Sequence, residues 1–305
     1  MGVGCSKSST NKHVVIDWRA GKKIEKYHWW PMKESENQEK SYYNNLYSDN
    51  GGLHKYDTLF GVSAREYQKK HHFRKQDSKR IDADWAGFCD KATILSCLYK
   101  YPVSDVLVNY NGNKVLFKVR DIEALMIIAC NNAIKDNISL FLGSRNNDKN
   151  KDEPYPSDLI NMLKIMCGTK DPFAMDVDNG VSVWNYSYDS VKVIETKNYP
   201  FEYKPAPEEG ETLYYNFKIN SSVYPEQNQD IWGYINTTTE PCDNVVVETK
   251  TEKWISHKHP DFLWRKYPEE NCWQGKCKIN PKVDARMVYM IYQSSISENY
   301  YLNLS

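Results

Sequence analysis

The sequence predicts an α+β fold, with helices in the first half of its ordered region and antiparallel strands in the second half. Apolar residues recur at helical spacing between residues 90 and 167, and strand-like apolar runs follow one another from about residue 190. Asn-Gly pairs, which favour tight hairpin turns, stand between candidate strands at Asn111-Gly112 and Asn179-Gly180. Helices and strands that are segregated along the chain in this way are typical of the α+β class.

Residues 31–84 precede the clearest elements and are polar. Turn-forming pairs at Asn44-Asn45 and Gly51-Gly52 interrupt them, so we expect a loosely packed segment there. A basic run between Arg65 and Arg80 is open to two interpretations. It is either a solvated helix face or a surface that contacts a membrane or a partner.

Apolar residues at helical spacing predict three helices, over residues 90–101, 122–134 and 158–167. Pro102 would end the first helix, because proline lacks the amide N–H that a helix needs. Asp121 and Asp158 stand at the starts of the other two, where a carboxylate caps free backbone N–H groups. Gly168 follows the third helix at the position that a left-handed glycine commonly occupies.

Strand-like runs fill the remaining segments. One hairpin is predicted from residues 106–110 and 114–119, and a second from residues 173–177 and 181–186, each around an Asn-Gly pair. Later strands are predicted over residues 199–203, 212–219, 231–235, 245–251 and 286–293.

The 305 residues have an ordinary globular composition, with 40% hydrophobic and 26% charged residues, which excludes an intrinsically disordered chain. No run approaches the roughly 18 consecutive apolar residues of a transmembrane helix. Lys and Arg total 40 and Asp and Glu total 40. A net charge of zero argues against a dedicated nucleic-acid binder.

The zero net charge hides an asymmetry along the chain. Residues 1–80 hold 16 basic and 9 acidic residues, whereas residues 81–305 hold 24 basic and 31 acidic residues. We therefore divide the chain into a basic, irregular N-terminal extension, residues 1–84, and an α+β domain, residues 85–305.

The N-terminus carries a candidate lipidation signal. Gly2 and Ser6 match the pattern M-G-x-x-x-[ST], which predicts N-myristoylation of Gly2, and Cys5 is placed for a palmitoyl chain. One myristoyl chain binds membranes only marginally, so a second signal is needed, and Cys5 and the basic residues that follow would supply it. The expected location is the cytosolic face of a membrane in a eukaryotic cell, with the plasma or ciliary membrane favoured.

In the reducing cytosol, the cysteines are expected to be mostly free thiols. Cys272 and Cys277 have the spacing of half a metal site, but no matching pair of Cys or His residues lies nearby. The sequence therefore predicts no metal and no cofactor.

Cys89 is the candidate nucleophile. It follows Trp85-Ala86-Gly87-Phe88 and directly precedes the first predicted helix. The dipole and the free N–H groups of a helix N-terminus stabilise a thiolate, which is a common way to activate a cysteine. The alternative is a buried apolar cysteine at the start of a core helix.

Several blocks of the chain, beginning with Trp85-Ala86-Gly87-Phe88-Cys89, form a longer pattern. The others are, in order, Tyr101-Pro102-Val103, Asp121-Ile122-Glu123-Ala124-Leu125, Val183-Trp184-Asn185 after Asp176, and Trp254–Trp264 with its His-Pro-Asp-Phe-Leu-Trp run. Together they resemble the transglutaminase elicitor family over about residues 85–265, and the His-Pro-Asp-Phe-Leu-Trp run is the most specific block.

The resemblance implies a papain- or transglutaminase-like fold and protein-glutamine acyltransferase activity. In that reaction a cysteine attacks a glutamine carboxamide, releases ammonia and passes the acyl group to an amine. Cys89 matches the family's nucleophile. Asp176 matches an acidic position that would orient the histidine that shuttles the proton.

The chain departs from the family pattern at this histidine. The family has one on the segment that aligns near residues 159–163, whereas no histidine lies here between His72 and His257. His257 and His259 are candidates for the role, and a structural turn that contains both is the alternative. Asp90 after the nucleophile is a second departure, since its negative charge would raise the pKa of the thiol.

Two hypotheses follow. The first is a membrane-anchored, transglutaminase-like acyltransferase that acts on a protein substrate. A cysteine protease on the same fold is a variant of it, because only the second nucleophile differs. The second hypothesis is a catalytically inactive relative that serves as a scaffold for a protein partner at a membrane or a membrane-associated cytoskeleton.

Overall fold

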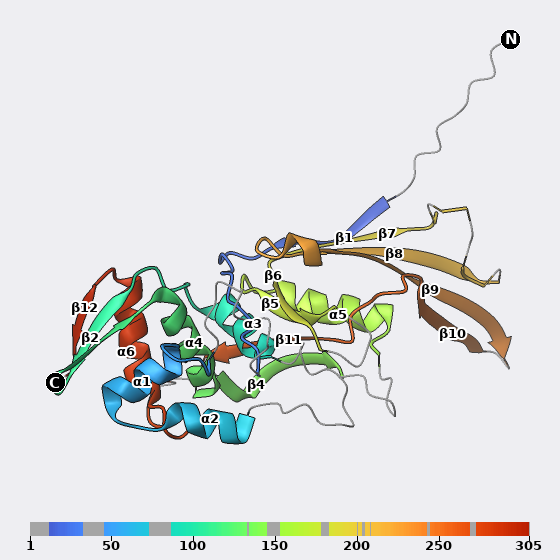
Figure 1. Ribbon diagram of the computed structural model, residues 1–305. Coiled ribbons are helices and arrows are strands. Elements are labelled where there is room, and N and C mark those ends of the chain that lie inside the picture. Colours follow the sequence, from blue (N-terminus) through green and yellow to red (C-terminus); the bar gives the residue numbers. More distant parts are fainter. Residues whose placement is uncertain are drawn as a thin grey trace, which may run out of the picture. The chain divides into compact units, whose positions relative to one another are not determined.

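The computed structural model contains helices and mainly antiparallel sheets, so the predicted α+β class is confirmed (Figure 1). It describes residues 12–32, 46–72, 87–132, 134–144, 153–177, 183–199, 201–202, 205–207, 209–242, 245–268 and 273–304. For residues 132, 134–139 and 268 it describes the backbone alone. The α-helices are α1 Gly52–Phe60, α2 Ala64–His72, α3 Cys89–Leu98, α4 Val119–Ala129, α5 Pro156–Cys167 and α6 Ala285–Ile296.

The described residues also form twelve strands in three sheets. The strands are β1 Lys12–Arg19, β2 Val106–Tyr110, β3 Asn113–Phe117, β4 Ile134–Gly143, β5 Phe173–Asp176, β6 Asn185–Tyr188, β7 Ser190–Thr196, β8 Glu211–Asn220, β9 Gln229–Cys242, β10 Val245–Trp254, β11 Phe262–Pro268 and β12 Tyr301–Asn303. Their orders are β1-β7-β8-β9-β10, β4-β11-β5-β6 and β12-β2-β3.

The chain divides into two compact units, and each combines distant segments. Unit 1 consists of Met1–Lys23 and Leu140–Arg265, and unit 2 consists of Ile24–Ser139 and Lys266–Ser305. The boundary predicted between residues 84 and 85 lies within the sequence range of unit 2, in a segment outside the described residues.

The predicted later strands are largely present in unit 1. Residues 212–219, 231–235 and 245–251 lie in β8, β9 and β10, which pair antiparallel in sequence order. β5 and β6 pair as the second predicted hairpin, although its turn at Asn179-Gly180 lies outside the described residues. The described part of residues 199–203 forms no strand.

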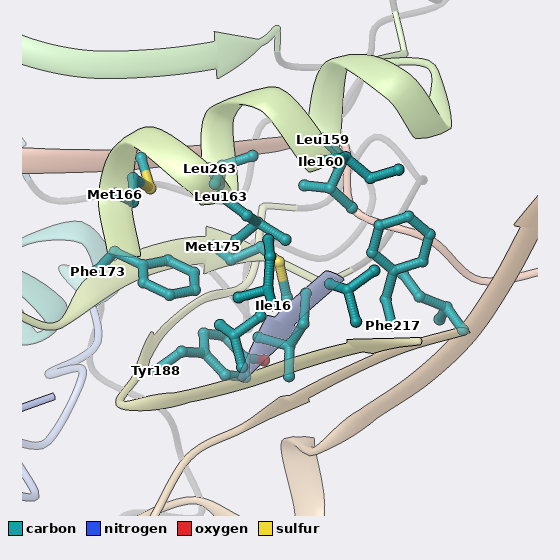
Figure 2. Packing of buried hydrophobic residues seen from close by; sticks show 14 of the residues in the cluster. Ile16, Leu159, Ile160, Leu163, Met166, Phe173, Met175, Tyr188, Phe217 and Leu263 are labelled. Carbon is teal, nitrogen blue, oxygen red and sulfur yellow. The ribbon is translucent and has the colours of Figure 1, made fainter. Parts of the chain in front are cut away.

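The core of unit 1 lies between α5 and these strands (Figure 2). Leu159 and Leu163, one helical turn apart on α5, are fully buried with Met175 of β5 and Phe217 of β8. The same cluster includes Ile16 of β1, so the N-terminal strand belongs to the core. Burial of each such side chain contributes about 1.5–3 kcal/mol to folding.

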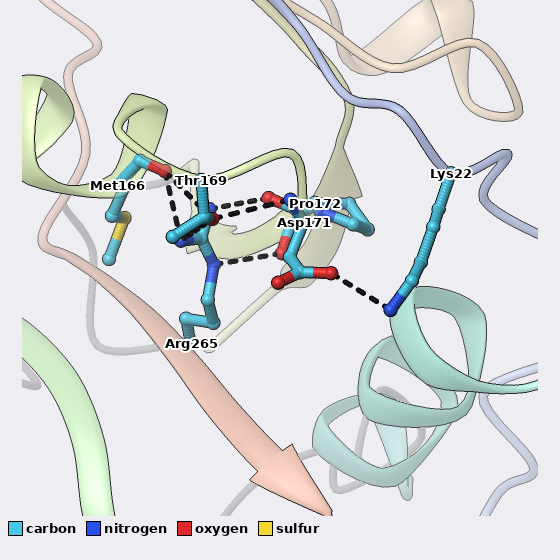
Figure 3. A network of polar contacts seen from close by, with 6 residues as sticks. All are labelled: Lys22, Met166, Thr169, Asp171, Pro172 and Arg265. Atoms are coloured by element: carbon cyan, nitrogen blue, oxygen red, sulfur yellow. Dashed lines mark hydrogen bonds and ion pairs between the residues drawn. The ribbon is translucent and has the colours of Figure 1, made fainter.

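A buried cation lies at the end of α5. Arg265 of β11 is only 3% exposed. Its guanidinium and Nε–H groups donate to one hydroxyl and three backbone carbonyls: Thr169 Oγ1 and the oxygens of Met166, Asp171 and Pro172 (Figure 3). Carbonyl groups near a helix C-terminus favour a cation, because they carry the negative end of the helix dipole.

Unit 2 combines α1–α4 and α6 with the sheet β12-β2-β3. β2 and β3 form the first predicted hairpin, and Asn111 and Gly112 have φ values of 49° and 85°, as a type I′ turn requires. α4 is deeply buried, since every side chain from Asp121 to Ala129 is inaccessible or nearly so.

The predicted helices are present with shifted starts. α4 begins at Val119 and α5 at Pro156, so Asp121 and Asp158 lie inside the first turn rather than before it. Their carboxylates still accept backbone N–H groups that precede the helix, at 2.8 and 3.2 Å. Gly168 follows α5 with φ −65°, so its predicted left-handed conformation is wrong.

The strand predicted over residues 286–293 is wrong, because this segment lies in α6. Its buried residues, Val288, Ile291 and Tyr292, recur at helical spacing, and Asp284 caps the helix by accepting a backbone N–H at 2.8 Å. Six of the eight residues are apolar or aromatic, and they would occupy both faces of a strand, so apolar content alone favoured the wrong period.

The predicted loose packing of residues 31–84 is wrong for residues 46–72. Leu53, Tyr56 and Leu59 on one face of α1 are almost completely buried. Gly51-Gly52 begins this helix instead of interrupting it, and Gly61 ends it in the left-handed region with φ 66°.

Candidate functional site

Cys89 is the first residue of α3, as the sequence predicted. Pro31 and Gly87 form a β-bridge just before it, and the N–H of Phe88 donates to the carbonyl oxygens of Trp29 and Trp30 at 2.7 and 3.1 Å. The segment that precedes α3 is thereby fixed by a distant part of the chain. Cys89 itself is half-buried.

Gly87 is required by the close packing of Trp29. A Cβ atom at residue 87 would lie 2.0 Å from Cε3 and 2.5 Å from Cζ3 of the indole. Only glycine allows the ring to lie so near the start of α3. The tryptophan therefore borders the backbone two residues before the thiol.

The charge beside Cys89 is partly balanced. The carboxylate of Asp90 forms an ion pair with Lys91 and also accepts the Lys91 N–H at 2.9 Å. The Lys91 ammonium group, paired with the Asp90 carboxylate, offsets part of the negative potential that Asp90 would otherwise place at the thiol. The predicted effect of Asp90 on the pKa of Cys89 stays a prediction.

A buried polar cluster in unit 2 was missed at the sequence level. Glu123 on α4 is fully buried, and its carboxylate accepts from the backbone N–H of His28 and from Tyr101 Oη at 3.0 Å. Arg120 lies 2.7 Å from the same carboxylate and 5.1 Å from the centre of the Trp30 ring. The available signal was an Arg and a Glu three residues apart in a helix that is apolar apart from these two residues and Asp121.

Burial shifts the pKa values in this cluster in opposite senses. It raises the pKa of Glu123 to about 7, and the nearby Arg120 charge lowers it only in part. It lowers the pKa of the His28 imidazole to about 4, and Arg120 acts in the same direction. In both residues burial disfavours the charged form, so Glu123 takes up a proton readily and His28 loses one readily.

Asp176 ends β5 in unit 1 and is fully buried. One of its carboxylate oxygens accepts the N–H of Trp184 at 2.9 Å, and its Cα pairs with that of Phe262 on β11. Trp264 Nε1 donates to Asn185 Oδ1 at 2.8 Å. The Val-Trp-Asn and His-Pro-Asp-Phe-Leu-Trp blocks thus meet in one sheet.

His259 is buried in unit 1 with both ring nitrogens near acceptors. Its Nε2 lies 2.7 Å from Glu153 Oε2, and its Nδ1 lies 3.4 Å from the Ser256 carbonyl oxygen. The ring stacks on Trp254, with 5.3 Å between centroids and 11° between planes. The carboxylate that orients His259 is therefore Glu153, whereas His257 is exposed.

The segment where the family pattern has its histidine forms α5 here. Leu159, Ile160 and Leu163 pack into the core of unit 1. Asp176, His257 and His259 belong to unit 1, and Cys89 belongs to unit 2. The predicted lipidation residues, Gly2 and Cys5, lie outside the described residues.

The described residues form neither a metal-binding cluster nor a membrane-spanning helix. No group of three His, Cys, Asp or Glu side chains in these ranges is arranged to hold a metal ion. None of the helices in these ranges is long and apolar enough to cross a membrane. Comparison of the chain with family models, curated proteins and solved structures found no match.

Proposed function

We propose that the chain is a membrane-tethered, transglutaminase-like acyltransferase with Cys89 as its nucleophile. The observation that carries the proposal is the position of Cys89 at the first residue of α3, half-buried and with Gly87 two residues before it. Free N–H groups at a helix N-terminus stabilise a thiolate. The resemblance of the Trp85–Cys89 segment to the transglutaminase elicitor family supports the same role.

The proposed reaction has two acyl-transfer steps. The Cys89 thiolate attacks a glutamine carboxamide, and the C–N bond breaks as the leaving nitrogen takes a proton and departs as ammonia. A primary amine then attacks the thioester, the C–S bond breaks, and the thiolate is restored. An imidazole must carry the protons, and His259, already oriented by Glu153, and His257 are the candidates.

The test is incorporation of a labelled primary amine into a glutamine-containing protein. Cys89→Ala is expected to lower the rate at least about a thousandfold, because the nucleophile is lost. Cys97→Ala, at the other end of α3, is the matched control and should leave the rate unchanged. His257→Gln and His259→Gln then identify the imidazole. Equal rates in wild type and Cys89→Ala would contradict the proposal.

Release of a cleaved peptide in the absence of an amine distinguishes the protease variant. A protease on this fold passes the acyl group to water, so it needs no amine and consumes a peptide bond. Loss of that product in Cys89→Ala would assign proteolysis to the same thiol.

A second candidate function is a catalytically inactive scaffold at a membrane or a membrane-associated cytoskeleton. Two observations favour it: both nitrogens of His259 lie near acceptors, and α5 offers apolar side chains where the family pattern has its histidine. Absence of turnover in the amine assay supports this candidate. Turnover that requires Cys89 excludes it.

We further propose that myristate on Gly2 and palmitate on Cys5 hold the chain at the cytosolic face of a eukaryotic membrane, such as the plasma or ciliary membrane. Two lipid chains give stable anchoring where one does not. Lys22 contributes less to the attraction toward an anionic membrane than its charge suggests, since its ammonium group pairs with the Asp171 carboxylate at 2.8 Å.

Cell fractionation tests the anchor. Gly2→Ala is expected to move the protein from the membrane pellet to the supernatant, and Cys5→Ser is expected to do so in part. Lys7→Gln is the control, because it removes one basic residue and leaves both acylation sites in place. Each basic residue contributes only about 1 kcal/mol of attraction to the membrane surface. Full membrane retention of Gly2→Ala would show that acylation is not the anchor.

A further inference from the structure

β10 is the outer strand of the five-stranded sheet in unit 1, next to β9 (Figure 1). Every residue from Val245 to Thr251 is exposed, although side chains alternate between the two faces of a strand. Within the described ranges, no strand pairs with the outer edge of β10. Seven successive residues of an edge strand therefore meet solvent on both faces.

This arrangement is unfavourable for an isolated chain. Val245, Val246 and Val247 are 64%, 65% and 46% exposed. Their partners at the end of β9, Cys242 to Glu240, are exposed as well, so this part of the sheet is a bare two-stranded ribbon. Two-stranded ribbons are marginally stable in water, and an apolar edge strand readily pairs with another strand.

The charges on β10 identify the strand that fits it. Directly opposite residues in an antiparallel pair share one face of the sheet. Two copies of β10 related by a two-fold axis must therefore pair about a single central residue. With Thr249 at the centre, Glu248 of each copy lies opposite Lys250 of the other. With either charged residue at the centre, like charges lie opposite each other.

Val247 at the centre also avoids this repulsion but pairs only Val245 to Thr249. Thr251 at the centre avoids it as well, but it is less favourable. It pairs a shorter part of β10 and relies on Glu252 opposite Lys250. The Glu252 carboxylate already accepts hydrogen bonds from Ser157 N and Oγ, at 2.9 and 2.8 Å. The Thr249 register uses Val245 to Lys253 and leaves that contact intact.

We propose that two copies of this chain associate through antiparallel β10–β10 pairing about a two-fold axis at Thr249. The five strands of each copy then form one continuous sheet. In this register Val247 lies opposite Thr251, and Val245 lies opposite the aliphatic stem of Lys253. The two Glu248–Lys250 pairs select this register, and the exposed valines become part of a four-stranded ribbon. This inference is independent of the reaction proposed for Cys89.

The test measures the mass of the full chain, made without acylation, by size-exclusion chromatography with light scattering. Wild type is expected at twice the chain mass of 35.7 kDa. Glu248→Lys and Lys250→Glu each replace two attractive pairs by two repulsive ones, so each should raise the dimer dissociation constant at least about tenfold. The double variant, and an equimolar mixture of the two single variants, should restore dimers.

Glu240→Lys is the matched control, because Glu240 is exposed on the same ribbon but lies on β9, opposite Val247. It is expected to leave the dissociation constant unchanged. A monomeric wild type at high micromolar concentration would overturn the proposal. So would a dimer that both single charge reversals leave intact.

Discussion

Unit 1 buries an arginine and unit 2 buries a glutamate, and the two side chains are stabilised in different ways. Arg265 in unit 1 donates to four uncharged oxygen atoms, three of them backbone carbonyls. Glu123 in unit 2 lies against the guanidinium of Arg120 and accepts two further hydrogen bonds. One charge is held by fixed dipoles, whereas the other is held by an opposite charge.

The difference follows from what each group can do when it is buried. A guanidinium cannot lose its proton at any physiological pH, so its burial is tolerated only where its N–H groups find acceptors. A carboxylate can take up a proton, so burial raises its pKa instead, here to about 7 for Glu123. The cation of unit 1 is thus a fixed structural element, and the acid of unit 2 is a titratable one.

The largest expected effect is the loss of the unit 1 cation. Arg265→Met leaves three carbonyls and a hydroxyl without their donor and should lower the free energy of unfolding by about 3–5 kcal/mol. Urea denaturation of the full chain measures it. Lys22→Ala, which removes an exposed partner of Asp171, is the control and should cost no more than about 1 kcal/mol. Equal costs for the two variants would mean that the network is not structural.

Replacement of glycine by alanine is expected to give the next largest effect. In each unit one glycine lies so close to another part of the chain that a Cβ atom would clash with it. Gly143 in unit 1 has φ 82°, and a Cβ there would lie 2.1 Å from the Asp261 carbonyl oxygen. A Cβ at Gly87 in unit 2 would meet the side-chain ring of Trp29 at 2.0 Å, and the nearest backbone atom only at 3.0 Å. Gly143→Ala should therefore cost about 3 kcal/mol and Gly87→Ala about 1–2 kcal/mol, measured by the same denaturation. The reverse order would show that Trp29 is held more rigidly than a backbone carbonyl.

The smallest expected effect is a change in how stability depends on pH. The folded pKa of Glu123, about 7, lies above its ordinary value of 4.5, so its contribution to stability falls as pH rises from 4.5 to 7. The folded pKa of His28, about 4, lies below its ordinary value of 6.5, so its contribution is lost as pH falls from 6.5 to 4. Between pH 4.5 and 6.5 the two contributions oppose each other.

Single variants should separate these two slopes. Relative to wild type, Glu123→Gln should make the slope of the free energy of unfolding against pH more positive, by about 1 kcal/mol per pH unit. His28→Phe should make the same slope more negative, by no more than that amount. Urea denaturation at pH 4.5, 5.5 and 6.5 measures both slopes. Slope changes of the same sign in the two variants would refute the opposed titrations.

Much of the fold could be predicted from local patterns. The Asn111-Gly112 pair fixed a hairpin because its turn needs two positive φ values that few residues adopt. Cys89 could be placed at a helix start because helical spacing begins directly after it. α6 could not be predicted by the same means, because its residues are apolar enough to satisfy either period.

The candidate site was predictable only where its residues are neighbours in the sequence. The Trp85–Cys89 segment identified the thiol, but nothing local indicated that Trp29 would border Gly87 or that Glu123 would accept the N–H of His28. The pairing of His259 with Glu153 joins residues more than a hundred positions apart. Such contacts depend on how distant segments pack, and the sequence pattern carries no signal for them.

The sequence by itself determined the α+β class, most strands and helices, and the thiol at a helix start. These follow from φ/ψ preferences and side-chain periods that act over a few residues. Only the tertiary structure decided which charges are buried, which acid orients His259, and which strand is left at the edge of the sheet. These depend on burial and on contacts between distant segments, since removal from water and the nearest partner set the energy of a polar group.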